Sequence, residues 1–338
     1  MTAPAGRPTD AVLPAEASGA VVLRHALARG VAGLQADRVA ALAGDAEAVH
    51  RMRIALRRMR AALRAFRPLL RGETLDPARP SAWEAHAGPA PPARAAAGLA
   101  ARDARLRALG NALGPARDWD VFLEETLAEA AGDLPPPLIA ALRAAAVPRR
   151  AAAYAALGRA LGDPARLARL GDYLGSWADR LDRGAFPSLE APVTTVAPAL
   201  LYRMARQVRR RARGIEHASA PALHALRKSV KRLRYATELL GPYATPPAGR
   251  AAITAGKTLQ DLLGRVNDAA VTPDLAARLA AGDGAGRQPD AVAAEHQRHL
   301  IEAIAALAAW AGARGERARR RLPKALAALK AALAEQDQ

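Results

Sequence analysis

The chain has 338 residues, no cysteine and a formal net charge of +18 at pH 7. Without cysteine it can form neither disulfides nor thiolate metal sites, and it cannot carry out thiol catalysis. No run of about 18 apolar residues could span a membrane, and residues 1–20 lack the basic and then apolar segments of a secretory signal. We therefore expect a cytoplasmic protein, and the basic charge favours an anionic partner.

Helical periodicity dominates the first half of the chain. Residues 1–17 are rich in proline and alanine and are predicted to be disordered. A proline-rich stretch over 72–94 is predicted to form a surface loop, and the three prolines after residue 134 interrupt the helical pattern. Helices are expected between these breaks, over residues 20–43, 47–70, 95–130 and 138–182.

The second half of the chain repeats this helical character. Residues 183–198 contain prolines and short extended segments, and are predicted to form a linker. Alanine is abundant and β-branched residues are few, so an all-α fold is expected throughout. The helices expected after the linker cover residues 199–214, 220–240, 248–281, 290–312 and 315–335.

Two of these helices carry a nearly identical charge pattern. Residues 50–64 read HRMRIALRRMRAALR and residues 224–238 read HALRKSVKRLRYATE. In both segments a histidine is followed by cations three, seven and ten positions later, which puts these side chains on one helix face at about 100° per residue. The opposite face is apolar and is expected to pack into a core. We call these faces the cationic stripes; they comprise His50, Arg53, Arg57, Arg60 and Arg64 in the first helix, and His224, Arg227, Lys231 and Arg234 in the second.

A cationic helix face can also be plain solvated surface. Such faces usually carry acidic residues one turn away from each cation. Residues 50–71 contain eight arginines and no aspartate or glutamate. Because like charges repel at this spacing, the stripe lowers the stability of its own helix. The pattern therefore favours a surface that binds a polyanion, with a passive solvated face as the alternative.

The similarity between the halves extends beyond the stripes. The segment LGNALGPARDWDVFL at 109–123 resembles LQDLLGRVNDAAVTP at 259–273. The match aligns Gly114 with Gly264 and Asp118 with Asp268.

This similarity predicts that one helical unit is duplicated, with a first repeat over about 18–182 and a second over about 199–335. The loop over 72–94 is then an insertion in the first repeat, and whether it gates a binding site is left open. The two aligned aspartates are expected to orient an arginine or cap a turn rather than to act as catalysts.

Together these segments resemble the CHAD family, the conserved histidine α-helical domain. The matching motifs are AVHRMRIALRRMRAALRAFRPLL at 48–70, ALGPARDWDVFL at 112–123, ALHALRKSVKRLRYATELLGPY at 222–243 and LQDLLGRVNDAAV at 259–271. Four motifs in this order make the resemblance specific, and it covers about 18–335. It implies a single all-α domain of two four-helix bundles, related by a pseudo-twofold axis, with a basic groove or pore between them.

The resemblance also implies a ligand, because in that family the groove binds inorganic polyphosphate. The residues of the two cationic stripes would then be the ligands in this chain. Arg107 and Lys257, on the helix after each stripe, are second-rank candidates, and Arg203 and Arg210 are weaker ones. Polyphosphate has no bases to read, so a row of cations and hydrogen-bond donors is sufficient to recognise it. The resemblance leaves open an association with polyphosphate granules and with granule proteins.

Nucleic acid is the main alternative ligand, because its phosphates would suit the same basic surface. Aromatic residues make up only 4% of the chain and do not alternate with the stripes, so platforms for base stacking are scarce. An enzyme is not expected, because the sequence lacks a recognisable acid–base constellation. It also lacks the ExExK motif of the triphosphatase domain that accompanies this family in some proteins.

No metal or other cofactor is expected either. His296 and His299 lie one helical turn apart, but a helix surface with a few histidines is usually inert. The cations around His50 and His224 would repel a metal ion. We expect these two histidines to act as donors instead; because a bound phosphate favours the protonated imidazole, affinity should rise as the pH falls through neutrality.

Overall fold

The computed structural model of the chain describes residues 13–71, 93–181, 189–215, 218–244, 246–280 and 291–334. Within these ranges every regular element is a helix, and one isolated β-bridge joins Ser18 to Pro192. The all-α prediction is therefore confirmed. The predicted tail over 1–17 is described only from residue 13 on, and the predicted loop over 72–94 lies outside the described residues except for 93 and 94, which are helical.

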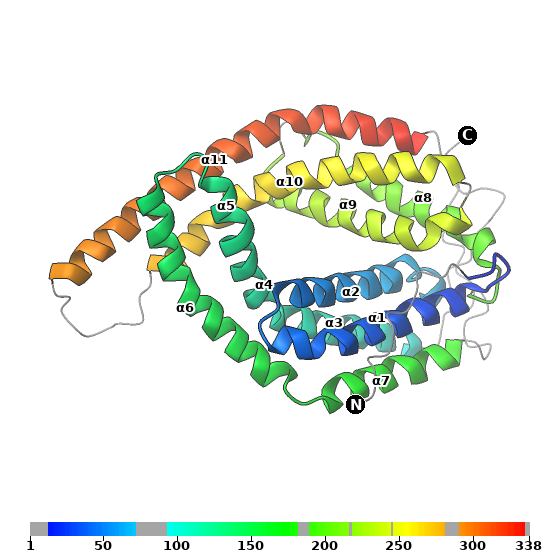
Figure 1. Cartoon of the computed structure of the whole chain (residues 1–338). Coiled ribbons are helices and arrows are strands. Elements are labelled where there is room, and N and C mark those ends of the chain that lie inside the picture. The colour runs from blue at the N-terminus through cyan, green and yellow to red at the C-terminus, as the bar shows by residue number, and fades with distance from the viewer. Residues whose placement is uncertain are drawn as a thin grey trace.

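The first group of packed helices comes from the first half of the chain (Figure 1). It consists of α1 (Gly19–Leu42), α2 (Ala46–Ala65), α3 (Ala93–Ala112) and α7 (Ala165–Leu181), and the short 3-10 helix η1 (Leu69–Arg71) follows α2. α1 packs against both α2 and α7, and α2 packs against α3. The Asp45 carboxylate caps the start of α2 by accepting hydrogen bonds from the backbone of Glu47 and Ala48 at 2.8 and 3.1 Å.

The second group comes from the second half of the chain (Figure 1). It consists of α8 (Val193–Arg211), α9 (Ala220–Leu240), α10 (Pro246–Ala280) and α11 (Ala291–Ala334), with the 3-10 helix η5 (Gly241–Tyr243) after α9. α9 packs against α8 and α10, and α10 packs along α11. One apolar cluster is drawn from this group and the turn after α8, while a larger one is built mainly from the first group.

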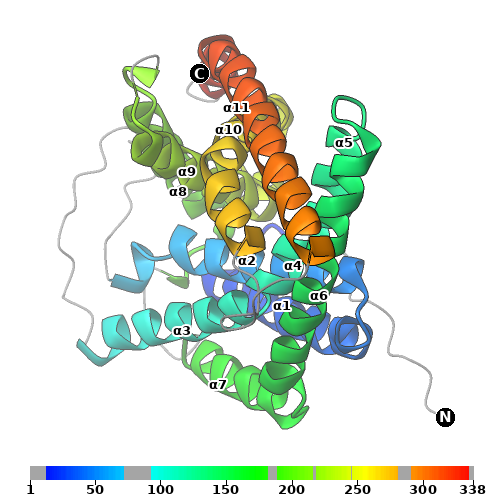
Figure 2. The same ribbon diagram turned by 90° about the vertical axis from the view of Figure 1, so that its left-hand side faces the viewer.

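A connecting segment lies between the two groups and touches both. It comprises α4 (Gly114–Val121), the π-helix η2 (Phe122–Thr126), α5 (Leu127–Ala130) and α6 (Pro136–Leu161). α6 packs against α4 and reaches across to α11 (Figure 2). The buried Asp120 carboxylate fastens α4 to α6, because it accepts hydrogen bonds from Arg150 Nε at 2.7 Å and from Tyr154 Oη at 2.8 Å.

Several predicted boundaries in the first half are wrong. The helix predicted over 47–70 ends at Ala65, because Pro68 lacks a backbone N–H to continue it. The helix predicted over 95–130 is broken after residue 112, and a new helix begins at Gly114 with Pro115 in its first turn; helical structure then continues through the π-helix η2 to Ala130. The helix predicted over 138–182 divides into α6 and α7 at residues 162–164, which include a glycine and a proline.

In the second half, the structure is more helical than the sequence suggests. α8 begins at Val193, inside the predicted linker, and continues through Pro198. The two helices predicted over 290–312 and 315–335 are one continuous helix, α11, which contains Pro323. In α8, buried apolar residues lie on both sides of Pro198, and in α11 they lie on both sides of the predicted gap at 313–314. These residues hold each helix against its neighbours, so tertiary packing outweighs local propensity.

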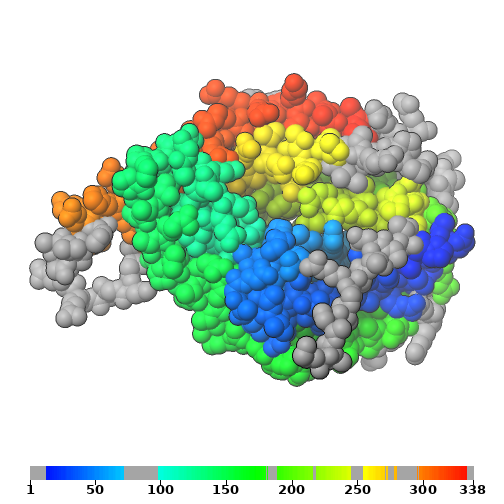
Figure 3. Space-filling view, in the orientation of Figure 1, coloured from blue at the N-terminus to red at the C-terminus, as the bar shows by residue number. Residues whose placement is uncertain are grey.

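The two stripe helices meet at the junction of the groups. α2 and α9 pack against each other and run in the same direction along the molecule (Figure 1). The segment from α4 to α6 covers the end of this junction at which both helices begin (Figure 3). Two packed groups of helices agree with the predicted pair of bundles, while the duplication and its pseudo-twofold axis stay predictions.

Candidate functional site

The cationic stripes of α2 and α9 come together in the folded chain. The charge of Arg57 on α2 lowers the pKa of both Arg227 and Lys231 on α9, after the larger effect of burial. Further along, Arg58 Nε on α2 lies 3.5 Å from Glu238 Oε2 on α9. We call the joined surface the cationic seam; it consists of His50, Arg53, Arg57, Arg60, Arg64, His224, Arg227, Lys231 and Arg234.

Lys231 is the most strongly perturbed cation of the seam. Burial, followed by the charges of Arg227 and Arg57, lowers its pKa from the ordinary 10.5 to about 7. In the free protein at neutral pH, a large fraction of the molecules therefore carry a neutral amine at this position. A bound anion nearby would favour the charged amine and so raise this pKa.

A glycine faces one arginine in each stripe. A Cβ atom placed on Gly114 would lie 3.3 Å from Arg53 Nη1, and one placed on Gly264 would lie 3.9 Å from Arg227 Nη2. The two glycines are those that the sequence comparison aligns. A side chain at Gly114 would crowd the guanidinium of Arg53, which would have to shift by a few tenths of an ångström.

The aligned aspartates lie beside the same two arginines. The charge of Asp118 raises the pKa of Arg53, and the charge of Asp268 raises the pKa of Arg227, although burial lowers both pKa values by more. Each carboxylate thus partly offsets the desolvation of its arginine. This arrangement agrees with the prediction that the aspartates orient an arginine.

A carboxylate that the sequence analysis missed lies at the other end of the first stripe. Asp103 on α3 accepts hydrogen bonds from Arg60 Nε at 2.8 Å, Arg64 Nη2 at 3.3 Å and Arg107 Nη2 at 3.1 Å. Burial alone would raise its pKa, but the hydrogen bond from Arg60 and the charge of Arg64 hold that pKa at about 2. The cations at this end are therefore partly neutralised. The only sequence signal for Asp103 is its position one turn before Arg107.

The two histidines lie at the ends of the stripes nearest the connecting segment. Burial, and then the charge of Arg117 on α4, lowers the pKa of His50 below the ordinary 6.5. His224 is exposed, and its Nδ1 lies 2.9 Å from Asn267 Oδ1 on α10. Because a carboxamide oxygen only accepts hydrogen bonds, Nδ1 is the donor in this pair. Arg117 and Asn267 were not predicted, although they occupy equivalent positions in the two aligned segments.

The weaker candidates lie on the flanking helices. Lys257 is exposed on α10, two turns before Gly264, and both Arg203 and Arg210 are exposed on α8.

Arg211 of α8 reaches α9, because its Nη1 donates to the Ala225 carbonyl at 3.3 Å and to the Ser229 hydroxyl. Burial and the charges of Arg64 and Arg211 lower the pKa of Arg232 to about 10. Arg211 and Arg232 therefore extend the cationic surface, and neither was predicted.

Other kinds of site find no support in the described part of the chain. There, no group of three or more histidine, aspartate and glutamate side chains could hold a metal ion. His299 is exposed, and the side chain of His296 lies outside the described residues. No described helix is long and apolar enough to cross a membrane.

Comparisons with known proteins identify relatives of the whole fold. The family model described as the CHAD domain matches residues 25–87 and 90–277. The crystal structure of the CHAD domain from the plant Ricinus communis is similar with a TM-score of 0.68 and 26% identity, over 94% of this chain and 96% of that one. PptA from Streptomyces chartreusis is similar in fold, with a TM-score of 0.55 and 17% identity, over 92% and 99% of the two chains. A comparison with curated proteins gives no match.

Proposed function

This chain belongs to the CHAD domain family, and we propose that it binds inorganic polyphosphate along the cationic seam. The observation that carries the proposal is the meeting of two cationic stripes from distant parts of the sequence. Arg57 on one stripe acts electrostatically on Arg227 and Lys231 on the other. Cations brought this close together destabilise the free protein unless an anion neutralises them.

The form of the seam suits a linear chain of phosphates. Successive turns of an α-helix present side chains about every 5.4 Å, so each stripe offers a row of donors. An arginine guanidinium can bind two phosphate oxygens at once. Because α2 and α9 run side by side, a chain along the seam would be held from two sides. The contacts are electrostatic, and binding is therefore expected to weaken steeply as salt increases.

The proposal describes a binding module rather than an enzyme. The aspartates beside the seam are engaged with arginines: Asp103 with Arg60, and Asp118 with Arg53. Such carboxylates are placed to orient cations rather than to transfer protons. A protein with this seam would also associate with polyphosphate granules, where granule proteins are possible further partners.

Calorimetric titration with long-chain polyphosphate at near-physiological salt tests the proposal. The variant Arg53→Gln/Arg57→Gln/Arg227→Gln removes charge from both stripes and is expected to bind at least about tenfold more weakly than the wild type. The matched control removes the same number of charges from exposed sites on α6 and after α8, by substituting glutamine for Arg143, Arg159 and Arg213. The control should bind within about twofold of the wild type.

Two results would contradict the proposal. Equal losses in the seam variant and the control would mean that binding reflects diffuse charge rather than a site. Competition tests the ligand class: long-chain polyphosphate should displace duplex DNA from the protein, and DNA should fail to displace polyphosphate. The reverse order would assign the seam to nucleic acid.

A further inference from the structure

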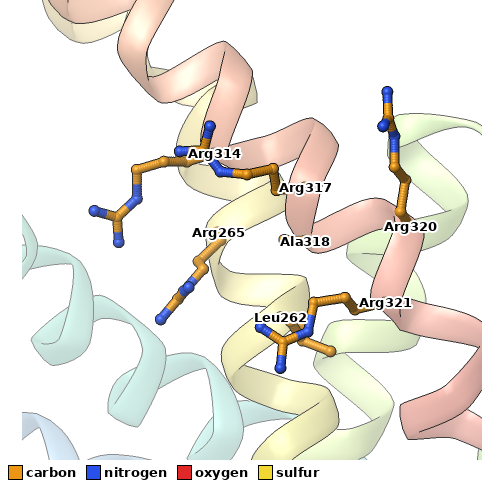
Figure 4. Close-up of a pocket in the computed structure, with 7 residues that line it drawn as sticks. All are labelled: Leu262, Arg265, Arg314, Arg317, Ala318, Arg320 and Arg321. Atoms are coloured by element: carbon orange, nitrogen blue, oxygen red, sulfur yellow. The ribbon is translucent and has the colours of Figure 1, made fainter.

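A second arginine-rich site lies outside the cationic seam, in a pocket between α10 and α11 (Figure 4). The pocket has a volume of about 440 Å³. Most of its lining is cationic, and we call it the arginine pocket. Its lining residues are Leu262 and Arg265 from α10, and Arg314, Arg317, Ala318, Arg320 and Arg321 from α11.

The charges of this pocket are poorly balanced. Arg314 is held in place by Glu129 on α5, with Nη2 and Oε2 2.6 Å apart, and its guanidinium lies 4.6 Å from the centre of the Trp310 ring. In the ranges that the structure describes, the other four arginines of the pocket form no ion pair with a carboxylate. Four cations gathered without an acidic partner favour an anionic ligand.

Close packing of the two helices builds this concentration of charge. A Cβ atom placed on Gly315 would lie 2.6 Å from the Ala269 side chain and 3.7 Å from the Arg265 carbonyl oxygen. The glycine thus lets α11 touch the backbone of α10, which brings Arg314 and Arg317 beside Arg265. On α11 the arginines at 314, 317 and 321 follow one another at helical spacing, where like charges repel.

The pocket adjoins the seam across α10. Gly264 faces Arg227 of the seam, while the next residue, Arg265, lines the pocket. The two sites also share charged neighbours. Asp268 is the carboxylate beside Arg227. Burial is the main cause that raises its pKa, and the charge of Glu129 raises it further. Glu129 is the residue that pairs with Arg314 in the pocket.

We propose that the arginine pocket is a second phosphate-binding site, which holds a further segment of a long polyphosphate chain already bound in the seam. This inference rests on the proposed function of the seam. The sites are separated by about the width of one α-helix, on the order of 10 Å. A long chain can occupy both at once, whereas tripolyphosphate can occupy only one. The second contact of a long chain is intramolecular and therefore raises its affinity.

The experiment compares four double variants with the wild type by calorimetric titration; the fourth is the lysine replacement of the pocket arginines given below. Arg317→Gln/Arg321→Gln changes the pocket, and Arg53→Gln/Arg227→Gln changes the seam. Lys324→Gln/Lys330→Gln, on exposed positions of α11, is the matched control for lost charge. Each protein is titrated with long-chain polyphosphate, with tripolyphosphate and with duplex DNA, and circular dichroism establishes that the helices are retained.

The proposal predicts different results for the two ligands. The pocket variant should bind long-chain polyphosphate about tenfold more weakly than the lysine control does. The wild type should take up two tripolyphosphate molecules, and the pocket and seam variants one each. Arg317→Lys/Arg321→Lys keeps the charge and should recover part of the long-chain affinity, which separates the loss of a ligand contact from damage to the fold.

The results that would overturn the second site differ from those that would overturn the function proposed for the seam. A pocket variant that matches the lysine control with both ligands would overturn the second site, even if the seam variant loses binding. Full affinity in the seam variant, with loss in the pocket variant, would overturn the function proposed for the seam and the bridging by one chain. A pocket variant that loses affinity only for duplex DNA would assign the pocket to nucleic acid and contradict the proposal.

Discussion

Lys231 gives the seam a dependence on pH that the histidines alone would not. Its pKa is about 7 in the free protein, and a bound phosphate favours the charged amine and so raises that pKa. Below about pH 7 the amine is charged in both states, and it contributes no pH dependence. At higher pH, binding must take up a proton, so affinity falls. We expect the affinity for polyphosphate to drop about tenfold from pH 7 to pH 9.

Titrations of wild type and Lys231→Arg at these two pH values test this prediction. Arginine keeps its charge in this range, so the variant should lose most of the pH dependence. The same substitution at exposed Lys330 on α11 is the control and should leave the dependence unchanged. The pKa of His50 lies below 6.5, so its contribution belongs to more acidic pH. An equally steep fall in Lys231→Arg would show that another group takes up the proton.

At the scale of helices, an element is predicted correctly from the sequence where its capping residue and its apolar spacing indicate the same boundaries. α9 occupies the predicted range, because Ser219 caps it and its apolar residues recur at helical spacing. The stripes, Gly114 and Gly264 were also found from spacing and from the match between the halves. The pairing of Asp103 with three arginines could not be predicted, because it depends on how α3 packs against α2. The arginine pocket was missed for the same reason, since it exists only where α10 and α11 cross.

Two glycines of α11 provide a test of that crossing. A side chain at Gly315 would clash with Ala269, whereas nothing lies within 4 Å of a Cβ placed on Gly312. We expect Gly315→Ala to lower the free energy of unfolding by about 1–3 kcal/mol through overpacking. Gly312→Ala should raise it by up to about 1 kcal/mol, because alanine favours the helix. Chemical denaturation followed by circular dichroism measures both values, and equal effects at the two sites would contradict the close contact.

At the scale of the whole molecule, repulsion between the cations of the seam lowers the stability of the free protein, while the same charges favour the binding of an anion. The net charge is +18, and the seam concentrates part of it where two helices meet. Salt screens such repulsion, and the screening length falls from about 30 Å at 10 mM to about 8 Å at physiological ionic strength. In the absence of ligand, we therefore expect the wild-type protein to become more stable as sodium chloride is added over this range.

Neighbouring arginines on α2 separate this repulsion from a general effect of charge. The charge of Arg57 repels the charges of Arg227 and Lys231, whereas the charge of Arg58 attracts that of Glu238. At low salt Arg57→Gln should raise the free energy of unfolding by up to about 1 kcal/mol and reduce its salt dependence, while it weakens polyphosphate binding. Arg58→Gln also removes one positive charge, but this charge attracts Glu238. The variant should therefore not stabilise the protein. Equal stabilisation by both variants would mean that net charge, rather than the seam, carries the repulsion.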